Sequence, residues 1–294
     1  MDDQKPHGLP QTPEIAALWA RADQGDAFAQ ASLGVMYQNG RGVPQDNAEA
    51  LRWYRLAADQ GHAPAQNALG IGCRDGDIVP QDDGEAVKWF RLAAEQEDSE
   101  AQLNLGYMFG EGRGVPKDGV EAVRWFRLAA DQGDAAAQLN LGVMYETGRG
   151  VPQDEVEAVK WFRLAAEQGL PDAQCFLGTM CQHGQGMPQD EEEALRWFRL
   201  AADQGHAGGQ HQLGLRYFEG RVVPQDYGET VKWLRLAAEQ GLPDAQCFLG
   251  TMCQEGQGMP QDEVEAVRWF RLAADQGYDQ AKAWLDEVDA AHPR

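Results

Sequence analysis

Seven tryptophans recur along this chain at a constant spacing of 36 residues, with no insertion or deletion between them. They are Trp53, Trp89, Trp125, Trp161, Trp197, Trp233 and Trp269. Each stands in the same phrase, E-[AT]-x-[RK]-W-x-R-L-A-A-[DE]-Q, so one short unit is copied seven times. A fixed period of this size is typical of a solenoid, whose units contact only their neighbours in sequence. We therefore expect positions that never change between copies to hold the array together, and positions that vary to be available to a partner.

The first copy, residues 26–61, shows how the unit folds. Apolar side chains at helical spacing over residues 27–39 predict a first helix, the A helix. The run GRGVPQ at 40–45 ends it, because glycine is favoured just after a helix and proline cannot continue one. Asp46 then caps a second helix, the B helix, which ends at Gly61. Glu49 completes a predicted capping box by reaching back to the N–H of Asp46.

The repeat sets the domain organisation. Residues 26–277 hold the seven copies, residues 13–25 resemble a lone B helix, and residues 278–288 resemble a lone A helix. We interpret these half-repeats as caps that cover the ends of the stack, so that residues 278–294 comprise a capping helix and a tail. Residues 1–12 and 289–294 are predicted to be disordered tails. The fold class is all-α.

The phrases AQxxLG, GxGVPQD and EAVxWFRLAAxQG closely resemble the Sel1-like repeat, a relative of the tetratricopeptide repeat. The resemblance covers residues 26–277, with departures at Gly209 in the sixth A helix and at Ile78 and Val222 in two loops. It implies a right-handed α-solenoid of antiparallel helix pairs, with the A helices on the concave side. It also implies an adaptor without chemistry of its own. Some members carry a disulfide that clamps each helix pair, and this chain lacks those cysteine pairs.

Charge and composition narrow the partners. The formal net charge of −22 argues against nucleic acid and against anionic membrane surfaces, both of which attract lysine and arginine. It favours a basic partner, attracted by a long-range field that salt weakens. The alternative is that the acid excess only keeps the array soluble. No basic region followed by an apolar stretch begins the sequence, and no long apolar run occurs, so we expect a cytoplasmic protein without a membrane span.

The residues give no candidate for catalysis, metal binding or a cofactor. The Asp and Glu at each B-helix start could suggest acid–base chemistry, but their recurrence in all seven copies favours capping. Five cysteines, an odd number on separate helices, predict neither a disulfide framework nor a C-x-x-C metal site. His206 and His211, five residues apart, do not share a helical face. The repeat arginine, which follows each repeated tryptophan by two residues, is expected to contact acidic side chains on adjacent helices.

The variable positions of the A helices share one helical face, and by resemblance to the tetratricopeptide repeat this face lines the groove. The predicted lining residues are Leu103, Tyr107, Leu139, Val143, Gln182, His183, His211, Leu215 and Phe218, with Arg74, Glu111, Glu146 and Glu219 on the polar rim. An apolar centre with an acidic rim suits a segment that carries apolar anchors and lysine or arginine. Tyr107 and Phe218 are the expected anchors, since aromatic residues dominate binding hot spots. The alternative is that these positions vary because nothing constrains them.

The sequence therefore predicts a non-enzymatic protein-interaction scaffold, a monomer or part of a heteromeric complex, that holds a basic segment of another protein in an acidic groove. One alternative is an immunity or inhibitor protein that neutralises a toxin or effector. Another is a hydrolase acting on cell-wall or β-lactam compounds, against which the missing cysteine pairs and signal peptide count.

Overall fold

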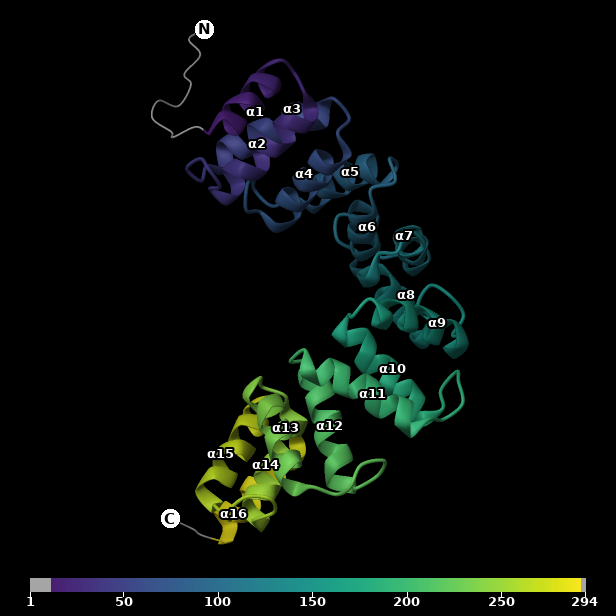
Figure 1. Ribbon diagram of the computed structural model, residues 1–294, viewed down its shortest axis with the longest axis vertical. Coiled ribbons are helices and arrows are strands. Elements are labelled where there is room, and N and C mark those ends of the chain that lie inside the picture. Colours follow the sequence, from purple (N-terminus) through teal and green to yellow (C-terminus); the bar gives the residue numbers. More distant parts are fainter. Residues whose placement is uncertain (1–11, 292–294) are drawn as a thin grey trace. The chain divides into compact units, whose positions relative to one another are not determined.

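The computed structural model describes residues 12–291, which form sixteen helices and no strand (Figure 1). The chain divides into two compact units, residues 1–153 and residues 154–294. The first unit holds α1 (Pro13–Asp23), α2 (Ala27–Asn39), α3 (Asn47–Asp59), α4 (Ala63–Asp75), α5 (Asp83–Ala94), α6 (Ser99–Glu111), α7 (Gly119–Asp131) and α8 (Ala135–Thr147). The second unit holds α9 (Glu155–Glu167), α10 (Pro171–His183), α11 (Glu191–Asp203), α12 (Ala207–Glu219), α13 (Tyr227–Glu239), α14 (Pro243–Glu255), α15 (Glu263–Asp275) and α16 (Asp279–Ala291).

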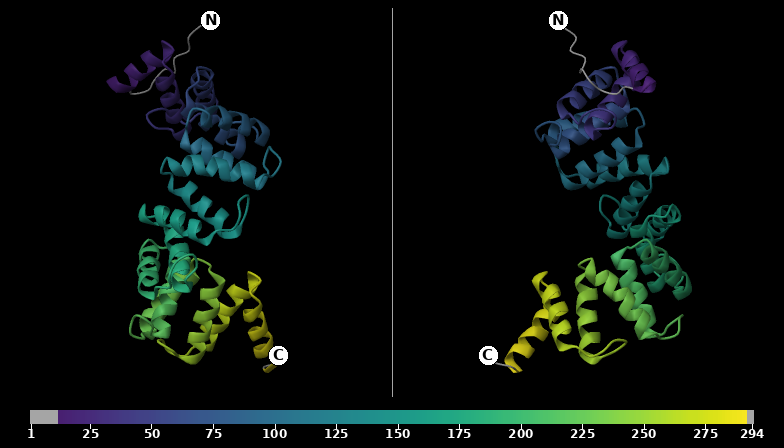
Figure 2. Two further views of the ribbon diagram at one scale, coloured as in Figure 1. Left: turned by 90° about the vertical axis from the view of Figure 1, so that its right-hand side faces the viewer. Right: turned by 60° about the vertical axis from the view of Figure 1, so that its left-hand side comes forward.

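Even-numbered helices are the predicted A helices and odd-numbered helices the B helices. Within each unit every helix packs against the helices that precede and follow it there, as α3 packs against α2 and α4. Figure 2 shows these antiparallel pairs from two further directions. The predicted all-α class and the two-helix repeat are confirmed.

The ends of the described region differ from the prediction. Thr12, which we assigned to a tail, is the N-cap of α1, and its hydroxyl accepts a hydrogen bond from the N–H of Ile15. Helix α16 runs to Ala291 rather than to Val288, because Ala290 and Ala291 favour helix. The other residues assigned to the tails, 1–11 and 292–294, lie outside the described residues.

Only one of the two hydrogen bonds of the predicted capping box is present at the start of the first B helix. The Asp46 carboxylate accepts from the N–H groups of Ala48 and Glu49, at 2.9 and 3.1 Å. The reciprocal half is wrong, because the N–H of Asp46 donates to the carbonyl oxygen of Tyr37 at the end of the A helix, 3.0 Å away. Glu49 instead accepts from Arg52 at 3.1 Å. The cap at Asp46 thus ties α3 to α2, the A helix of its own repeat, and the same backbone bond recurs at five further caps: Asp82, Asp118, Asp190, Asp226 and Asp262.

A buried glutamine in the A helix of each of the seven repeats connects neighbouring helices. The side-chain amide of Gln66 donates to the carbonyl oxygen of Ala58 in the preceding B helix, at 3.1 Å. Its own oxygen accepts from the amide of Gln96, at the end of the following B helix, at 2.8 Å. The same arrangement recurs around Gln246 in the second unit. Since buried amides need partners, these bonds explain why the glutamine never varies.

The invariant glycine of the A helix allows close packing of the B helix. A Cβ at Gly34 would lie 2.6 Å from the ring of Tyr54, which is a clash. Leu33 beside it is fully buried. Close contact with the B helix of the same repeat therefore restricts which side chains fit at Leu33 and Gly34.

The repeated tryptophans lie at the interfaces between repeats, but their indole N–H groups are satisfied differently. Trp53 and Trp125 are buried, and the N–H group of each has no hydrogen-bond partner among the described residues. In the second unit the N–H group of Trp161 likewise has no partner among the described residues, whereas Trp197 donates to Glu193 four residues earlier, at 3.2 Å. Trp233 donates in the same way, at 3.0 Å, to the glutamate at its own B-helix start.

The repeat arginines also differ between units. In the first unit the guanidinium of Arg91 lies over the ring of Phe109, 5.7 Å from its centroid. Arg127 lies over the ring of Tyr145 and donates to its hydroxyl. In the second unit the arginine instead forms an ion pair with a glutamate at the start of the next B helix. These pairs are Arg163 with Glu193 at 2.8 Å and Arg235 with Glu265 at 3.0 Å.

One position on the following A helix distinguishes the copies with these two arrangements. It is aromatic where the arginine meets a ring, and it is Cys181 or Cys253 where the arginine reaches a glutamate. Arg199, in the second unit, faces Tyr217 and donates to its hydroxyl at 3.1 Å, so the residue and not the unit sets the choice. Arg55, whose following A helix carries Cys73 at this position, forms no ion pair with a described residue, so the cysteine permits the contact without imposing it. The predicted contact with an acidic side chain on an adjacent helix is confirmed for Arg163 and Arg235.

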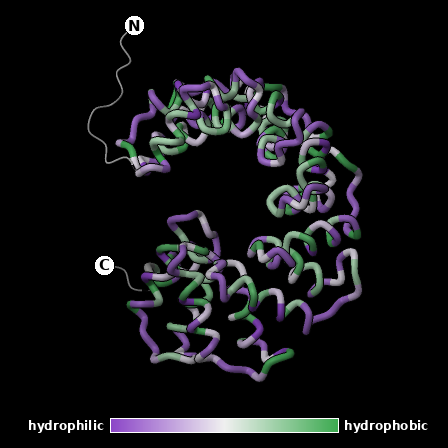
Figure 3. The backbone as a smooth tube through the Cα atoms, turned by 45° about the horizontal axis from the view of Figure 1, so that its top comes forward, coloured by the Kyte–Doolittle hydropathy of each residue, from purple (hydrophilic) through white to green (hydrophobic). Residues whose placement is uncertain are grey.

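Hydrophobic and hydrophilic stretches alternate along the whole trace (Figure 3). Between residues 12 and 291, no helix is both long enough and apolar enough to cross a membrane.

Candidate functional site

The predicted site residues fall in both units, and each unit presents its own A-helix surface. In the first unit this surface comprises Arg74 on α4, Leu103, Tyr107 and Glu111 on α6, and Leu139, Val143 and Glu146 on α8. Leu103, Leu139 and Val143 are half-buried, and Glu111 is exposed. The result is an apolar floor on two neighbouring A helices with acidic residues toward their C-terminal ends.

Tyr107 is the most accessible large residue of this surface, with 40% of its area exposed. Its hydroxyl accepts a hydrogen bond from the amide of Asn140 on α8, at 2.8 Å. Its ring packs edge-to-face on Phe126 of α7, with centroids 5.4 Å apart. Two contacts from two different helices therefore fix an exposed aromatic ring. A ring held in this way loses little further entropy when a partner covers it.

Polar side chains extend the same surface toward α4. Arg74 donates to Asn104 at 2.7 Å and forms an ion pair with Asp75, also at 2.7 Å. Asn104 in turn donates to Asn67 at 3.1 Å. Arg74 is therefore held by the protein itself. The asparagines were not among the predicted residues, although their place beside the variable leucines was visible in the sequence.

In the second unit the predicted residues are less uniform. Gln182 and His183 end α10, where Gln182 is half-buried and His183 exposed. His211, Leu215 and Phe218 on α12 are half-buried. Burial lowers the pKa of His211 below its usual value, with a smaller opposing effect from the Asp244 carboxylate.

Phe218, the second predicted anchor, packs within the protein. Its ring meets Phe248 of α14 edge-on, with centroids 4.9 Å apart, and lies 5.6 Å from the ring of Tyr227. It belongs to the apolar cluster of α13 to α16. Of the two aromatic anchors, Tyr107 presents the larger exposed fraction.

Beneath the rim of α12 lies a buried cation that sequence reasoning missed. Arg216 is 4% exposed and pairs with the predicted rim residue Glu219 at 3.3 Å. Its Nε has no hydrogen-bond partner among the described residues. The sequence did carry a sign of this residue, because the other six repeats have methionine or glycine at the position of Arg216. Glu219 therefore neutralises a buried charge, which occupies it within the protein.

The cysteines form no reactive site. All five are free thiols. Burial raises the pKa of Cys175 and that of Cys181 to about 11, which keeps both thiols protonated. Over the described part of the chain, no group of three histidine, cysteine or acidic side chains has an arrangement that could hold a metal ion.

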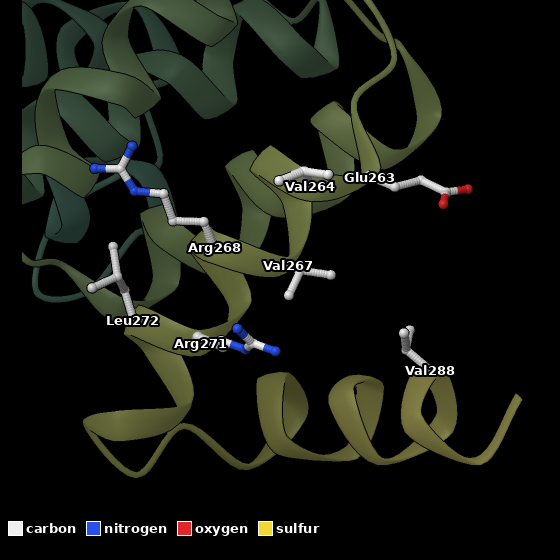
Figure 4. A pocket seen from close by; sticks show the side chains of 7 residues that line it. All are labelled: Glu263, Val264, Val267, Arg268, Arg271, Leu272 and Val288. Carbon is white, nitrogen blue, oxygen red and sulfur yellow. The ribbon is translucent and has the colours of Figure 1, made fainter. Parts of the chain in front are cut away.

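Hollows on the B-helix side form a second type of surface. On α3 a hollow of about 320 Å³ is lined by Ala48, Leu51, Arg52, Arg55, Leu56 and Asp59. On α15 a hollow of about 560 Å³ is lined by Glu263, Val264, Val267, Arg268, Arg271 and Leu272, with Val288 from α16. Figure 4 shows Val267, Arg271 and Val288 bordering one space between α15 and α16. Corresponding repeat positions line both hollows.

These hollows contain an invariant residue that is only partly buried. The repeat leucine, three residues after each repeated tryptophan, is between 39% and 47% exposed in every copy. The seven are Leu56, Leu92, Leu128, Leu164, Leu200, Leu236 and Leu272. Invariance between copies therefore does not require full burial.

The fold defines an all-helical repeat protein built from helix pairs. The Sel1 repeat matches the chain in seven consecutive stretches: 27–62, 63–98, 99–134, 135–170, 171–206, 207–242 and 243–278. The chain belongs to the Sel1 repeat family. Its repeats begin one residue later than the boundaries we predicted. Members of this family generally mediate protein–protein interactions and are generally not enzymes.

Solved structures agree on the fold. The chain is similar to c5321, a protective antigen of uropathogenic Escherichia coli, with 37% identity and a TM-score of 0.84 over 93% of this chain. It spans 58% of the length of that antigen's chain. A Sel1 repeat protein from Oxalobacter formigenes is 38% identical, with a TM-score of 0.76 over 94% of this chain and 80% of that one.

A more distant structure is the immunity protein Pa5087 of Pseudomonas aeruginosa, 22% identical with a TM-score of 0.46 over 75% of this chain and 82% of that one. That similarity is too low to carry a role over to this chain. No curated protein matches the sequence.

Proposed function

We propose that this chain is a non-enzymatic scaffold that binds a segment of another protein on the A-helix surface of its first unit. The observation that carries the proposal is Tyr107, an exposed ring fixed by Asn140 and Phe126. Leu103 and Leu139 supply apolar area on the same helices. Aromatic residues in such settings are frequent hot spots of binding.

The partner segment carries apolar side chains together with lysine or arginine. Glu111 is exposed beside Tyr107, and the whole chain has a net charge of −22. Charge then governs how fast the partner associates and how salt weakens association, while the aromatic contact governs the lifetime of the complex. Five free thiols are consistent with a cytoplasmic role, since thiols stay reduced there.

Affinity purification with mass spectrometry tests the proposal when wild type is compared with two variants. Tyr107→Ala removes the fixed ring, and Val264→Ala removes an even more exposed apolar side chain from the B helix α15. We expect partners that wild type and Val264→Ala retain and Tyr107→Ala loses, with a loss of about 2 kcal/mol in binding free energy. Retention of every partner by Tyr107→Ala, with loss in Val264→Ala, would contradict it.

Glu111→Lys separates the electrostatic part. The variant should associate more slowly at low salt and dissociate at the wild-type rate. An unchanged association rate would show that the charge of Glu111 does not contribute to association.

A further inference from the structure

The A helices of the first unit share a row of apolar residues, one per helix, at a single repeat position. The row comprises Val35 on α2, Ile71 on α4, Tyr107 on α6 and Val143 on α8. Val35 and Tyr107 are 45% and 40% exposed, and Ile71 and Val143 are half-buried. At the same position α10 and α14 of the second unit carry threonine, so the continuous row belongs to the first unit.

Neighbouring A helices touch through side chains beside this row. The amide of Asn140 on α8 donates to the hydroxyl of Tyr107 on α6 at 2.8 Å, and Asn104 on α6 donates to Asn67 on α4 at 3.1 Å. Helices in such side-chain contact lie about 8–10 Å apart. The row therefore offers a partner one apolar contact about every 10 Å.

Two polar atoms next to the Tyr107 ring have unused hydrogen-bonding capacity. Nδ2 of Asn140 donates both of its hydrogens, to the carbonyl oxygen of Ala136 at 2.7 Å and to the hydroxyl of Tyr107. Because a carbonyl oxygen can only accept, this bond fixes which end of the Asn140 amide is the nitrogen. The Tyr107 hydroxyl therefore keeps its own hydrogen to donate, and Oδ1 of Asn140 accepts from no described residue.

A partner that covers the Tyr107 ring also removes water from these two atoms. A desolvated donor or acceptor without a partner is unfavourable, so the bound segment has to supply a carbonyl oxygen and an N–H group at this point. The main chain of an extended segment carries both. In an α-helix both groups are already bonded within the helix, except at its ends.

The spacing of the row distinguishes between extended conformations. Side chains on one face of a β-strand recur at every second residue, about 7 Å apart, which does not match the row. A polyproline-II helix has three residues per turn and rises about 3.1 Å per residue, so one face recurs about every 9 Å. An α-helix matches the row with every seventh residue, at about 10 Å, but its main-chain groups are engaged. Of these three conformations, only polyproline II meets both requirements.

We infer that the partner segment bound by the first unit is extended in the polyproline-II conformation and carries an apolar side chain at every third position. Its apolar side chains contact the row. Its main chain accepts from the Tyr107 hydroxyl and donates to Oδ1 of Asn140. The inference rests on the proposed function, because it describes what the surface around Tyr107 binds, and it fails alone if the bound segment is helical.

The test measures binding of the full chain to three end-capped peptides by fluorescence anisotropy in 0.15 M salt. The periodic peptide, LPKLPKLPKLPK, has leucine at every third position, and its prolines favour polyproline II. The scrambled peptide, LLPKKLPPLKPK, has the same composition without that period. The helical peptide, LKAEAKALKAQAKALKAEAKAL, has leucine at every seventh position and the same net charge as the other two.

We expect wild type to bind the periodic peptide about tenfold more tightly than the scrambled one, because only the periodic peptide places a leucine at each A helix. Tyr107→Phe with Asn140→Leu keeps the apolar area and removes both polar atoms. This variant should bind the periodic peptide about tenfold more weakly, which corresponds to two hydrogen bonds, and should bind the helical peptide as wild type does.

Two further variants test the position of the contact. Val35→Ser shortens the row at α2 and should weaken the periodic peptide about threefold without weakening the scrambled one. The control variant, Thr251→Val, removes a hydroxyl from the same repeat position in the second unit and should change binding of the periodic peptide less than about twofold.

Three results would overturn the inference. Equal binding of the periodic and scrambled peptides would mean that the row does not recognise the period. Binding of the periodic peptide that is unaffected by Tyr107→Phe with Asn140→Leu would mean that the main chain does not contact this pair. Tighter binding of the helical peptide, lost in Tyr107→Ala, would overturn the inference and leave the proposed function intact. Binding of all three peptides that Tyr107→Ala leaves unchanged would contradict the proposed function as well.

Discussion

Two repeats, one in each unit, meet the same packing requirement with different chemistry. In the first unit Arg127 rests on the ring of Tyr145 and bonds to its hydroxyl, while the indole N–H of Trp125 has no partner among the described residues. In the second unit a single glutamate, Glu193, accepts from both Arg163 and Trp197. The comparison shows that an invariant residue need not have an invariant partner. A ring or a cysteine on the intervening helix redirects the arginine, and the glutamate it reaches then also serves the tryptophan.

The largest effect is expected from removing the tryptophans. Trp125→Ala and Trp197→Ala should each lower the free energy of unfolding by about 3–5 kcal/mol, because each leaves a large cavity between helices. Phenylalanine separates the two: Trp197→Phe should cost about 0.5–1.5 kcal/mol more than Trp125→Phe, since only Trp197 loses a hydrogen bond. Denaturant unfolding followed by circular dichroism measures both. Equal costs for the two phenylalanine variants would contradict the comparison.

The shared glutamate should matter more than its counterpart in the first unit. Glu193→Ala leaves two donors without an acceptor and should cost about 1–2 kcal/mol. A double-mutant cycle with Arg163→Ala should give a coupling energy of about 1 kcal/mol, since this pair is only partly exposed. The corresponding residues of the first unit are Arg91 and Glu121. Because Arg91 lies over the ring of Phe109 and Glu121 pairs with Arg124 instead, these two should couple by less than about 0.5 kcal/mol. Coupling of the same size in both cycles would remove the distinction between the units.

Exchanging the deciding residue should convert one arrangement into the other. Cys181→Tyr with Met187→Val restores the pair of residues that the first unit carries at these two positions. The ring should then hold Arg163, and its coupling to Glu193 should fall below about 0.3 kcal/mol. Persistence of the original coupling in this variant would mean that something other than the aromatic residue directs the arginine.

Acid should loosen the second unit before the first. Burial lowers the pKa of His211, so the folded state favours the neutral ring. The unfolded chain then binds more protons as the pH falls from about 6.5 to the lower folded pKa, and the stability of the folded state decreases over that window. Hydrogen exchange at pH 7.5 and pH 5.5 should show α12 losing protection while α6, with Leu103 at the same repeat position, does not. His211→Leu should abolish the difference, and a dependence that survives in this variant would assign it to another group.

The smallest effect is expected from reductant. The five cysteines are free, and the thiols of Cys181 and Cys253 are fully buried with pKa values of about 11. Melting temperatures with and without dithiothreitol should therefore agree within error. A clear decrease under reducing conditions would reveal a disulfide and revive the analogy with cysteine-clamped relatives.

Much of the fold could be predicted because the repeat supplies seven observations of one structure. The bounds of α2 followed directly from residues 27–39, and the invariance of Gly34 pointed to a close contact before the ring of Tyr54 was seen. The cap was only half predicted, because the N–H of Asp46 is taken by Tyr37, which no local pattern reveals. The sequence indicated which residues make close contacts, but the partner of each contact depends on how two helices approach one another.

The candidate site was less predictable for a related reason. Variation between copies identified the A-helix face, yet it could not distinguish Tyr107, which is exposed, from Phe218, which packs on Phe248. Both are aromatic, and the residues of the neighbouring helix determine which of them is covered. The invariance of the position of Leu272 suggested burial, yet this leucine is partly exposed.

The glutamine bonds have a consequence for how such a chain lengthens. Gln66 satisfies a carbonyl of the preceding repeat and an amide of its own, and Gln246 does the same in the second unit. These junctions therefore present the same hydrogen-bond donor and acceptor. An inserted block of whole repeats closes both of its junctions without leaving an orphaned amide. The segment LPDAQCFLGTMCQ, present at 170–182 and again at 242–254, is the kind of repetition that such an insertion would leave in the sequence.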